Sequence, residues 1–198
     1  HPITPEIALK VGMAAGVVVG YIHGQFSHRA SANTFVVGIT LTILVTGLTS
    51  FLLSEMTIDS TRTAELSIPG LAEIPIIGSA LFIQRWPAYL IWPLIPIAGW
   101  VVYRSRWGLE CRAAGENPQA ADVAGVPVNL RRRQSLLVVG ASAGFGGAYL
   151  AVGEVGYFTQ EMTAGRGFLA LAAVIFGGWR LLGTVLGCVL FGTAFSLR

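Results

Sequence analysis

The chain has 198 residues, of which 54% are apolar and only 12% are charged. Soluble domains of this size carry about 25% charged residues, so the composition excludes an ordinary soluble protein and indicates a chain that lies largely in lipid. The net charge of +3 includes a single lysine, Lys10, so we expect no binding to nucleic acid. Cys111 and Cys188 lie far apart, and they predict neither a disulfide framework nor a metal site.

Four apolar stretches are long enough to cross a membrane, which takes about 20 helical residues with about 17 as a lower limit. They cover approximately residues 7–22, 34–54, 86–103 and 134–152. None carries an ionisable residue near its middle, and Lys10 lies close to one end of the first stretch. The sequence therefore predicts an all-α fold, a polytopic bundle of transmembrane helices.

A fifth apolar region, Gly167–Leu197, is interrupted by the segment Gly177–Arg180. Each half is short for a full crossing, so we expect a broken or partly re-entrant helix pair. Irregular backbone at membrane depth is tolerated only where protein or a water-filled path surrounds it, which would make this region part of a pathway. The alternative is two tilted ordinary helices with Arg180 at an interface.

The placement of arginine predicts the orientation of the chain. Six arginines lie between Tyr103 and Gln134, whereas the connection 55–85 carries four acidic residues against two arginines. Because basic loops stay in the cytoplasm, we expect residues 104–133 inside, together with His28 and Arg29. Residues 55–85 are then extracytoplasmic, with one or two helical turns near 76–83.

Glycines recur every four residues near the start of the chain, and the same spacing returns in two later pairs. The residues are Gly12, Gly16, Gly20 and Gly24, then Gly140 with Gly144 and Gly183 with Gly187. Small residues at this interval lie on one helix face and let two helix backbones approach closely in lipid. The spacing predicts tight helix packing.

A short helix is predicted within the cytoplasmic segment. Asn117 is a favourable N-cap, Pro118 suits the first turn, and Gly125 is a natural stop. The helix would span 117–124, about two turns, which is too short to be stable alone. The small residues of this helix and of the turn before it would fit a groove in a partner protein. Alternatively, the segment is a structured loop that has no partner. The small residues are Ala113, Ala114, Ala120, Ala121 and Ala124.

This part of the sequence resembles the permeases of bacterial ABC importers for nucleosides and simple sugars, which are relatives of the branched-chain amino-acid and ribose permeases. The family pattern G-L-x-x-R-A-x-G-E-N-P-x-A-A-x-x-x-G-I-x-V is matched at Gly108, Leu109, Arg112, Ala113, Gly115, Glu116, Asn117, Pro118, Ala120, Ala121, Gly125 and Val128. The block 162–179 is similar to the late signature of the family, and 144–147 and 46–52 also resemble it. The match is weaker around Asn33–Thr42, where a serine and a second asparagine of the pattern are absent.

The resemblance implies one transmembrane permease domain over residues 1–198, truncated at both ends, that contains the coupling segment 104–133. The helix at 117–124 would dock on a cytoplasmic ABC ATPase subunit, and a second permease, identical or different, would complete the path. An extracytoplasmic binding protein would deliver the substrate through the inner membrane of a bacterium. Because the sequence has no G-x-x-x-x-G-K-[S/T] motif, ATP and Mg would bind the ATPase, and we expect no cofactor, catalytic residue or enzyme activity in this chain.

Two groups of candidate residues follow. Those for ATPase coupling are Arg112, Gly115, Glu116, Asn117, Pro118, Ala120, Ala121, Asp122 and Gly125. Those for the substrate path are Phe158, Met162, Thr163, Arg166 and Phe168. Arg166 alternatively serves only in structure, paired with Glu161 or Glu154. An alternative function is an ion-coupled secondary transporter or channel for a small polar solute, which would usually bury an ionisable group at mid-membrane. The four predicted spans show no such group there.

Overall fold

The computed structural model describes residues 4–29, 33–55, 65–67, 83–159 and 162–196. It divides the chain into two compact units, residues 1–160 and residues 161–198, which are considered separately. Among the described residues nearly all regular structure is helical, which confirms the predicted all-α fold. The turns expected near 76–83 fall outside the described residues except for Ile83, which starts a short strand.

The first unit contains the N-terminal helices and a small hairpin of strands. In chain order its elements are α1 (Pro5–Gly24), the π-helix η1 (Gln25–Arg29), α2 (Thr34–Glu55), β1 (Glu65–Ser67), β2 (Ile83–Arg85), α4 (Trp86–Tyr89), α5 (Ile91–Arg104), α6 (Arg106–Glu116), α7 (Pro118–Val123), α8 (Val128–Tyr149) and the π-helix η2 (Leu150–Val155). β1 pairs antiparallel with β2. The second unit consists of α9 (Arg166–Phe176) and α10 (Leu181–Ser196).

In the described part of the first unit, four helical segments are long and apolar enough to cross a membrane. They are Pro5–Ser27, Thr34–Glu55, Trp86–Arg104 and Val128–Val155. Large apolar side chains along them are exposed, as expected for a surface that faces lipid, and Phe35 and Ile43 are 74% and 69% accessible. Each of the four predicted spans therefore corresponds to one of these helical segments, although the fourth differs in where it starts.

The fourth span begins earlier than the sequence predicted. Helix α8 starts at Val128 and not at Gln134, so Arg131, Arg132 and Arg133 lie within its first turns. Helix α8 extends beyond the apolar stretch because arginine is a good helix former and its long side chain reaches the polar interface of the membrane. The segment 104–133 is accordingly two short helices plus the start of a long one.

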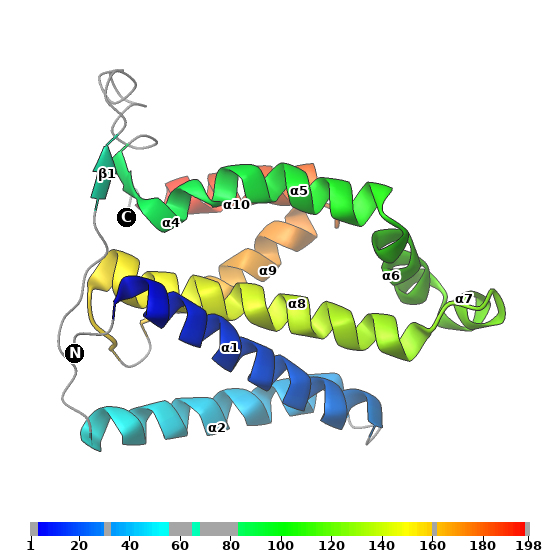
Figure 1. The fold of residues 1–198 in the computed structure, drawn as a ribbon, viewed down its shortest axis with the longest axis horizontal. Coiled ribbons are helices and arrows are strands. Elements are labelled where there is room, and N and C mark those ends of the chain that lie inside the picture. The colour runs from blue at the N-terminus through cyan, green and yellow to red at the C-terminus, as the bar shows by residue number, and fades with distance from the viewer. Residues whose placement is uncertain (1–3, 30–32, 56–64, 68–82, 160–161, 197–198) are drawn as a thin grey trace. The chain divides into compact units, whose positions relative to one another are not determined.

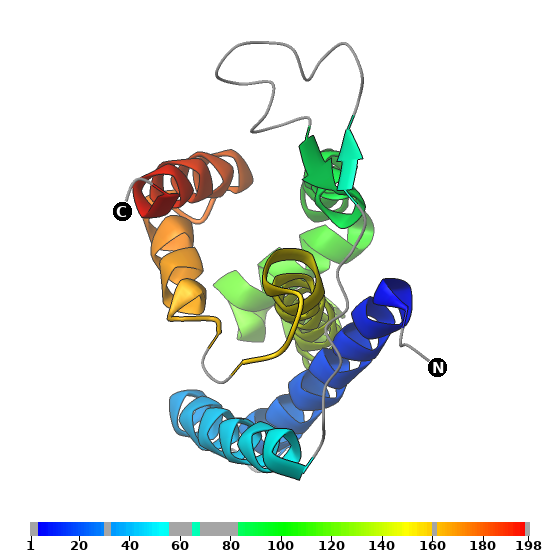
Figure 2. The same cartoon turned by 90° about the vertical axis from the view of Figure 1, so that its left-hand side faces the viewer.

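The glycine stripe brings α1 and α8 into direct backbone contact, and the two helices lie side by side in Figures 1 and 2. A Cβ added to Gly16 would overlap the carbonyl oxygen of Gly140, and one added to Gly144 would overlap that of Gly12. Gly20 lies against Leu136 and Gly140 in the same way. This pairing shows that α1 and α8 run antiparallel, and it confirms the packing predicted from the glycine spacing.

The antiparallel pair sets the two ends of the first unit. The end of α1 and the start of α8 lie at the same end, and α6 and α7 project there (Figure 1, right). The strands β1 and β2 lie at the opposite end. Six arginines therefore gather at one end, here called the arginine-rich end: Arg104, Arg106, Arg112, Arg131, Arg132 and Arg133. This is the distribution on which the predicted orientation depends.

The second unit is a helical hairpin, and it confirms the predicted break. The chain turns between α9 and α10 with positive φ at Gly178 (62°) and at Trp179 (59°), which is a costly conformation for an aromatic residue. Gly177 lies against Gly183 so closely that neither position accepts a Cβ without a shift. The helices have 11 and 16 residues, so each is short for a crossing.

Candidate functional site

Helix α6 connects the third span to the predicted coupling helix. Ser105 begins it as an N-cap, because its side chain accepts a hydrogen bond from the Gly108 backbone N–H at 3.0 Å and donates one to the Val101 carbonyl at 2.6 Å. A Cβ on Gly108 would overlap the Val101 carbonyl oxygen, so glycine allows the tight turn out of α5. Sequence reasoning missed α6; the one signal for it was a serine two residues before Trp107.

Helix α7 matches the predicted short helix closely. The Asn117 side chain accepts a hydrogen bond from the Ala120 backbone N–H at 3.0 Å, and Pro118 occupies the first turn. At the other end the Gly125 N–H donates to the Asp122 carbonyl at 2.9 Å, and Gly125 has a φ of +83° that glycine adopts without strain. The N-cap and the stop lie where the sequence predicted them.

The small residues of the segment divide between inside and outside. Ala114, Ala121 and Val128 are buried against one another in a cluster that holds α6, α7 and the start of α8 together. The small-residue face expected to meet a partner is therefore partly internal, and Ala121 supports the segment from beneath. The predicted coupling residues that are exposed are Arg112, Gly115, Glu116, Asn117, Ala120, Asp122 and Gly125, whereas Pro118 is half-buried.

Sequence reasoning missed the most exposed apolar side chain of this segment. Val123 on α7 is 90% accessible. It follows Ala121 by two residues, or about 200° around a helix, so the burial of Ala121 directs Val123 outward. The signal was present in the sequence, but using it required knowing which face of α7 was covered.

A polar network joins α6 to α8 and was also missed. Arg131 Nε lies 2.6 Å from Glu110 Oε2 in an ion pair, and Arg131 Nη1 donates to Gln134 Oε1 at 2.7 Å. The Trp107 indole N–H donates to the same Gln134 oxygen at 2.9 Å. All four side chains are half-buried, so α6 is fixed against the first turns of α8.

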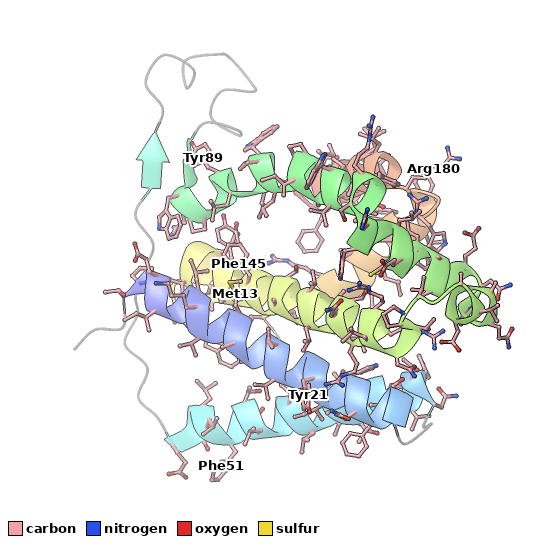
Figure 3. All side chains as sticks on the ribbon, turned by 45° about the vertical axis from the view of Figure 1, so that its right-hand side comes forward. Met13, Tyr21, Phe51, Tyr89, Phe145 and Arg180 are labelled. Atoms are coloured by element: carbon pink, nitrogen blue, oxygen red, sulfur yellow. The ribbon has the colours of Figure 1, made fainter. Side chains whose placement is uncertain are left out.

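Two other arginines of this end lie over aromatic rings. The Arg112 guanidinium on α6 is 5.4 Å from the ring centre of Tyr103, near the end of α5. The Arg133 guanidinium is 5.9 Å from the ring centre of Tyr21 on α1, which is labelled in Figure 3. These contacts are favourable by about 0.5–1 kcal/mol where exposed.

The five residues predicted for the substrate path are divided between the two units. Phe158 follows η2 in the first unit, and Met162, Thr163, Arg166 and Phe168 belong to the second. The Arg166 guanidinium lies 5.4 Å from the Phe195 ring centre, and both line a pocket of about 250 Å³ between α9 and α10. Glu161, one alternative partner of Arg166, lies outside the described residues, and a role in the substrate path stays a prediction.

Residues 2–198 match the family described as branched-chain amino acid transport system / permease component. The chain belongs to this family. The resemblance that the motifs 108–128 and 162–179 indicated is thereby confirmed.

Curated relatives in this permease family are similar over nearly the whole chain. "Putative glucose ABC transporter permease protein TsgC13" of Haloferax volcanii is 34% identical over 97% of the chain and 60% of the relative. The nucleoside ABC transporter permease protein NupC of Lactococcus lactis is 34% identical over 98% of the chain and 63% of the relative. The guanosine ABC transporter permease protein NupQ of Bacillus subtilis is 30% identical over the same shares.

The chain spans about 60% of the length of these relatives. No solved structure matches it. Membership of this permease family, together with four helices suited to crossing lipid, identifies the chain as part of a multi-pass membrane protein. Outside those spans, the family pattern is most complete in the α6–α7 segment, whose two helices have side-chain caps at Ser105 and Asn117.

Proposed function

We propose that this chain is the membrane-spanning permease part of an ATP-driven ABC importer that carries a nucleoside or a simple sugar across the inner membrane of a bacterial cell. The family and the names of the relatives support this over an ion-coupled transporter or channel. Two relatives are named for nucleosides or guanosine and one for glucose, which is why the proposed substrate class includes both.

The proposal rests mainly on the observation that α7 is held in place by its neighbours while its outer side is exposed. A helix of six residues is too short to be stable alone, yet α7 is capped by Asn117 and held from beneath by Ala121. Its outer side presents Asp122 and the 90% exposed Val123, and Glu116, the last residue of α6, is exposed as well. An ordered surface with an apolar centre and acidic neighbours suits docking to another protein.

The proposed assembly places each task on a separate subunit. A cytoplasmic ATPase binds ATP and Mg and receives α7 in a groove, and a second permease, identical or different, completes the path. An extracytoplasmic binding protein supplies the substrate. In this arrangement residues 104–133 are cytoplasmic, 55–85 are extracytoplasmic, and the chain conducts substrate and transmits force without being an enzyme.

The experiment reverses one charge on α7 in the full-length permease. We expect Asp122→Arg to reduce the amount of ATPase that co-purifies with the permease, and to reduce uptake of labelled guanosine by about tenfold or more. A loss of about 1.4 kcal/mol in docking is sufficient for that change. Unlabelled glucose and leucine added as competitors test the substrate class, and leucine should compete least.

Glu55→Arg is the matched control. It makes the same change of charge at the C-terminus of α2, away from the arginine-rich end. A cation at a helix C-terminus interacts favourably with the helix dipole. We expect it to leave both ATPase association and uptake near the wild-type level. Full ATPase binding and uptake by Asp122→Arg, at equal amounts of protein in the membrane, would show that α7 is not the coupling surface.

A further inference from the structure

We propose that Arg131 is a positioning residue that joins the coupling helix to the transmembrane helices, so that α7, α6, α8 and α1 move as one lever. The proposal rests on the proposed function, because it concerns how force received at α7 reaches the membrane. It assigns a role to Glu110, Arg131 and Gln134, which lie behind the docking surface.

The first link is polar and centres on one guanidinium. Arg131 uses Nε for Glu110 on α6, at 2.6 Å, and Nη1 for Gln134 one turn further along α8, at 2.7 Å. Gln134 Oε1 accepts a second hydrogen bond from Trp107, close to the start of α6. The planar guanidinium fixes direction as well as distance, so α6 is held against α8 at two points along its length.

The second link is apolar and lies at the other end of α6. Ala114 is 1% exposed and Ala121 is 5% exposed, and both pack on Val128, the first residue of α8. The Val126 N–H also donates to the Ala121 carbonyl at 2.9 Å. Small side chains in contact have few rotamers through which to adjust, so displacement of α7 is transmitted to α8 rather than absorbed.

The third link carries the displacement into the membrane. Gly12, Gly16, Gly140 and Gly144 bring the backbones of α1 and α8 together without intervening side chains. With η2, the fourth span has 28 residues and reaches about 42 Å at 1.5 Å per residue. A small tilt imposed at the arginine-rich end is therefore delivered to the opposite end of α8.

The neighbouring arginines make different contacts and provide a comparison. Arg133 lies over Tyr21 of α1, and Arg112 lies over Tyr103 at the end of α5. Arg131 alone among the arginines with described contacts pairs with a carboxylate of α6. Removal of the Arg131 side chain should thus loosen α6 from α8. Removal of the Arg133 side chain changes the net charge of this end by the same amount, so the two variants can be compared directly.

The experiment uses the full-length permease with its ATPase in proteoliposomes. We expect Arg131→Ala to retain the ATPase but to transport at least about tenfold less guanosine per ATP hydrolysed, because hydrolysis no longer moves α8. Arg131→Lys should recover part of the guanosine transported per ATP hydrolysed, because an ammonium group can pair with Glu110 but lacks the second nitrogen that donates to Gln134. Arg133→Ala is the matched control and should remain near wild type. If Arg131→Ala is not produced, Glu110→Gln takes its place.

A spin-label pair tests the lever without any substrate. In a variant with Cys111→Ala and Cys188→Ala, labels are attached at Leu109→Cys on α6 and Val139→Cys on α8, which are both exposed positions. We expect one narrow distance that is the same without nucleotide and after vanadate trapping. Arg131→Ala should broaden it, and Arg133→Ala should not. A wild-type distance that changes on trapping, or an unchanged transport ratio in Arg131→Ala, would overturn the proposal. If no ATPase associated even with the wild-type permease, the proposed function would fail, and the distances in the permease alone would still decide whether Arg131 fixes α6 to α8.

Discussion

Asn117 ends one helix and begins the next. Its backbone N–H donates to the Ala113 carbonyl at 3.0 Å as the last bond of α6, and its side chain accepts from the Ala120 N–H at 3.0 Å at the start of α7. Its backbone is extended, with φ −145° and ψ 94°, which breaks the helix between the two. One residue therefore sets the angle at which the proposed docking surface leaves α6.

Removal of the cap should loosen α7 without unfolding the protein. Asn117→Ala loses the Ala120 hydrogen bond, which costs about 1 kcal/mol, so we expect amide hydrogen exchange within α7 to accelerate about fivefold. Hydrogen exchange with mass spectrometry on the purified permease checks this. Asn117→Asp keeps an accepting oxygen and should exchange like the wild type; equal acceleration in both variants would contradict the capping role.

At the scale of elements, the α1–α8 pair is the main packing interface of the first unit. Lipid removes the hydrophobic reason for two helices to associate, so close contact and dispersion must supply it. The glycines provide that contact only where they face the partner helix. Gly140 and Gly144 approach the backbone of α1, whereas Gly146 and Gly147 have no atom of another element within 4 Å of an added Cβ.

Two alanine substitutions two residues apart should have opposite effects. Gly144→Ala places a methyl group against the Gly12 carbonyl, so we expect a loss of about 1–3 kcal/mol in stability. Gly146→Ala faces open space and should be neutral or stabilising by up to about 1 kcal/mol, because alanine favours the helix. Thermal unfolding of the purified permease in detergent measures both. Equal loss of stability in the two variants would show that α1 and α8 do not pack through this face.

At the scale of the whole molecule, the helix directions determine whether the arginines collect at one end, and this distribution in turn predicts the orientation of the chain in the membrane. α1 and α8 are antiparallel, and α5 ends where α6 and α7 begin, so the turn after α1 and the α6–α7 segment share one end of the first unit. All six arginines between Tyr103 and Gln134 lie there. By the positive-inside rule this distribution supports the proposal that this end lies in the cytoplasm.

Cysteine labelling tests this orientation directly. In a variant with Cys111→Ala and Cys188→Ala, single cysteines are introduced at Val123 on α7 or at Tyr157 after η2, both of which are exposed. A maleimide that cannot cross membranes should label the Tyr157→Cys protein in intact spheroplasts and the Val123→Cys protein only after permeabilisation. The reverse pattern would invert the proposed topology.

Much of the fold could be predicted because local patterns are strong in a membrane chain. Continuous apolar runs gave the spans, glycines at intervals of four gave the close interface, and Asn-Pro with a later glycine gave α7. The misses have a common cause. Helix α6 and the early start of α8 lie in polar sequence, where hydrophobicity marks no boundary, and a single serine, Ser105, was the one cap signal for α6.

The amino-acid sequence by itself determined that the chain spans lipid, where α7 begins and ends, where the late helix pair breaks, and which family it resembles, because solvent preference and backbone propensity are local properties. Only the tertiary structure decided which face of each helix is covered. It buried Ala121 and exposed Val123, and it joined Arg131 to a carboxylate 21 residues away in the chain. Such pairings depend on the packing of α6 against α8, and no local pattern encodes that contact.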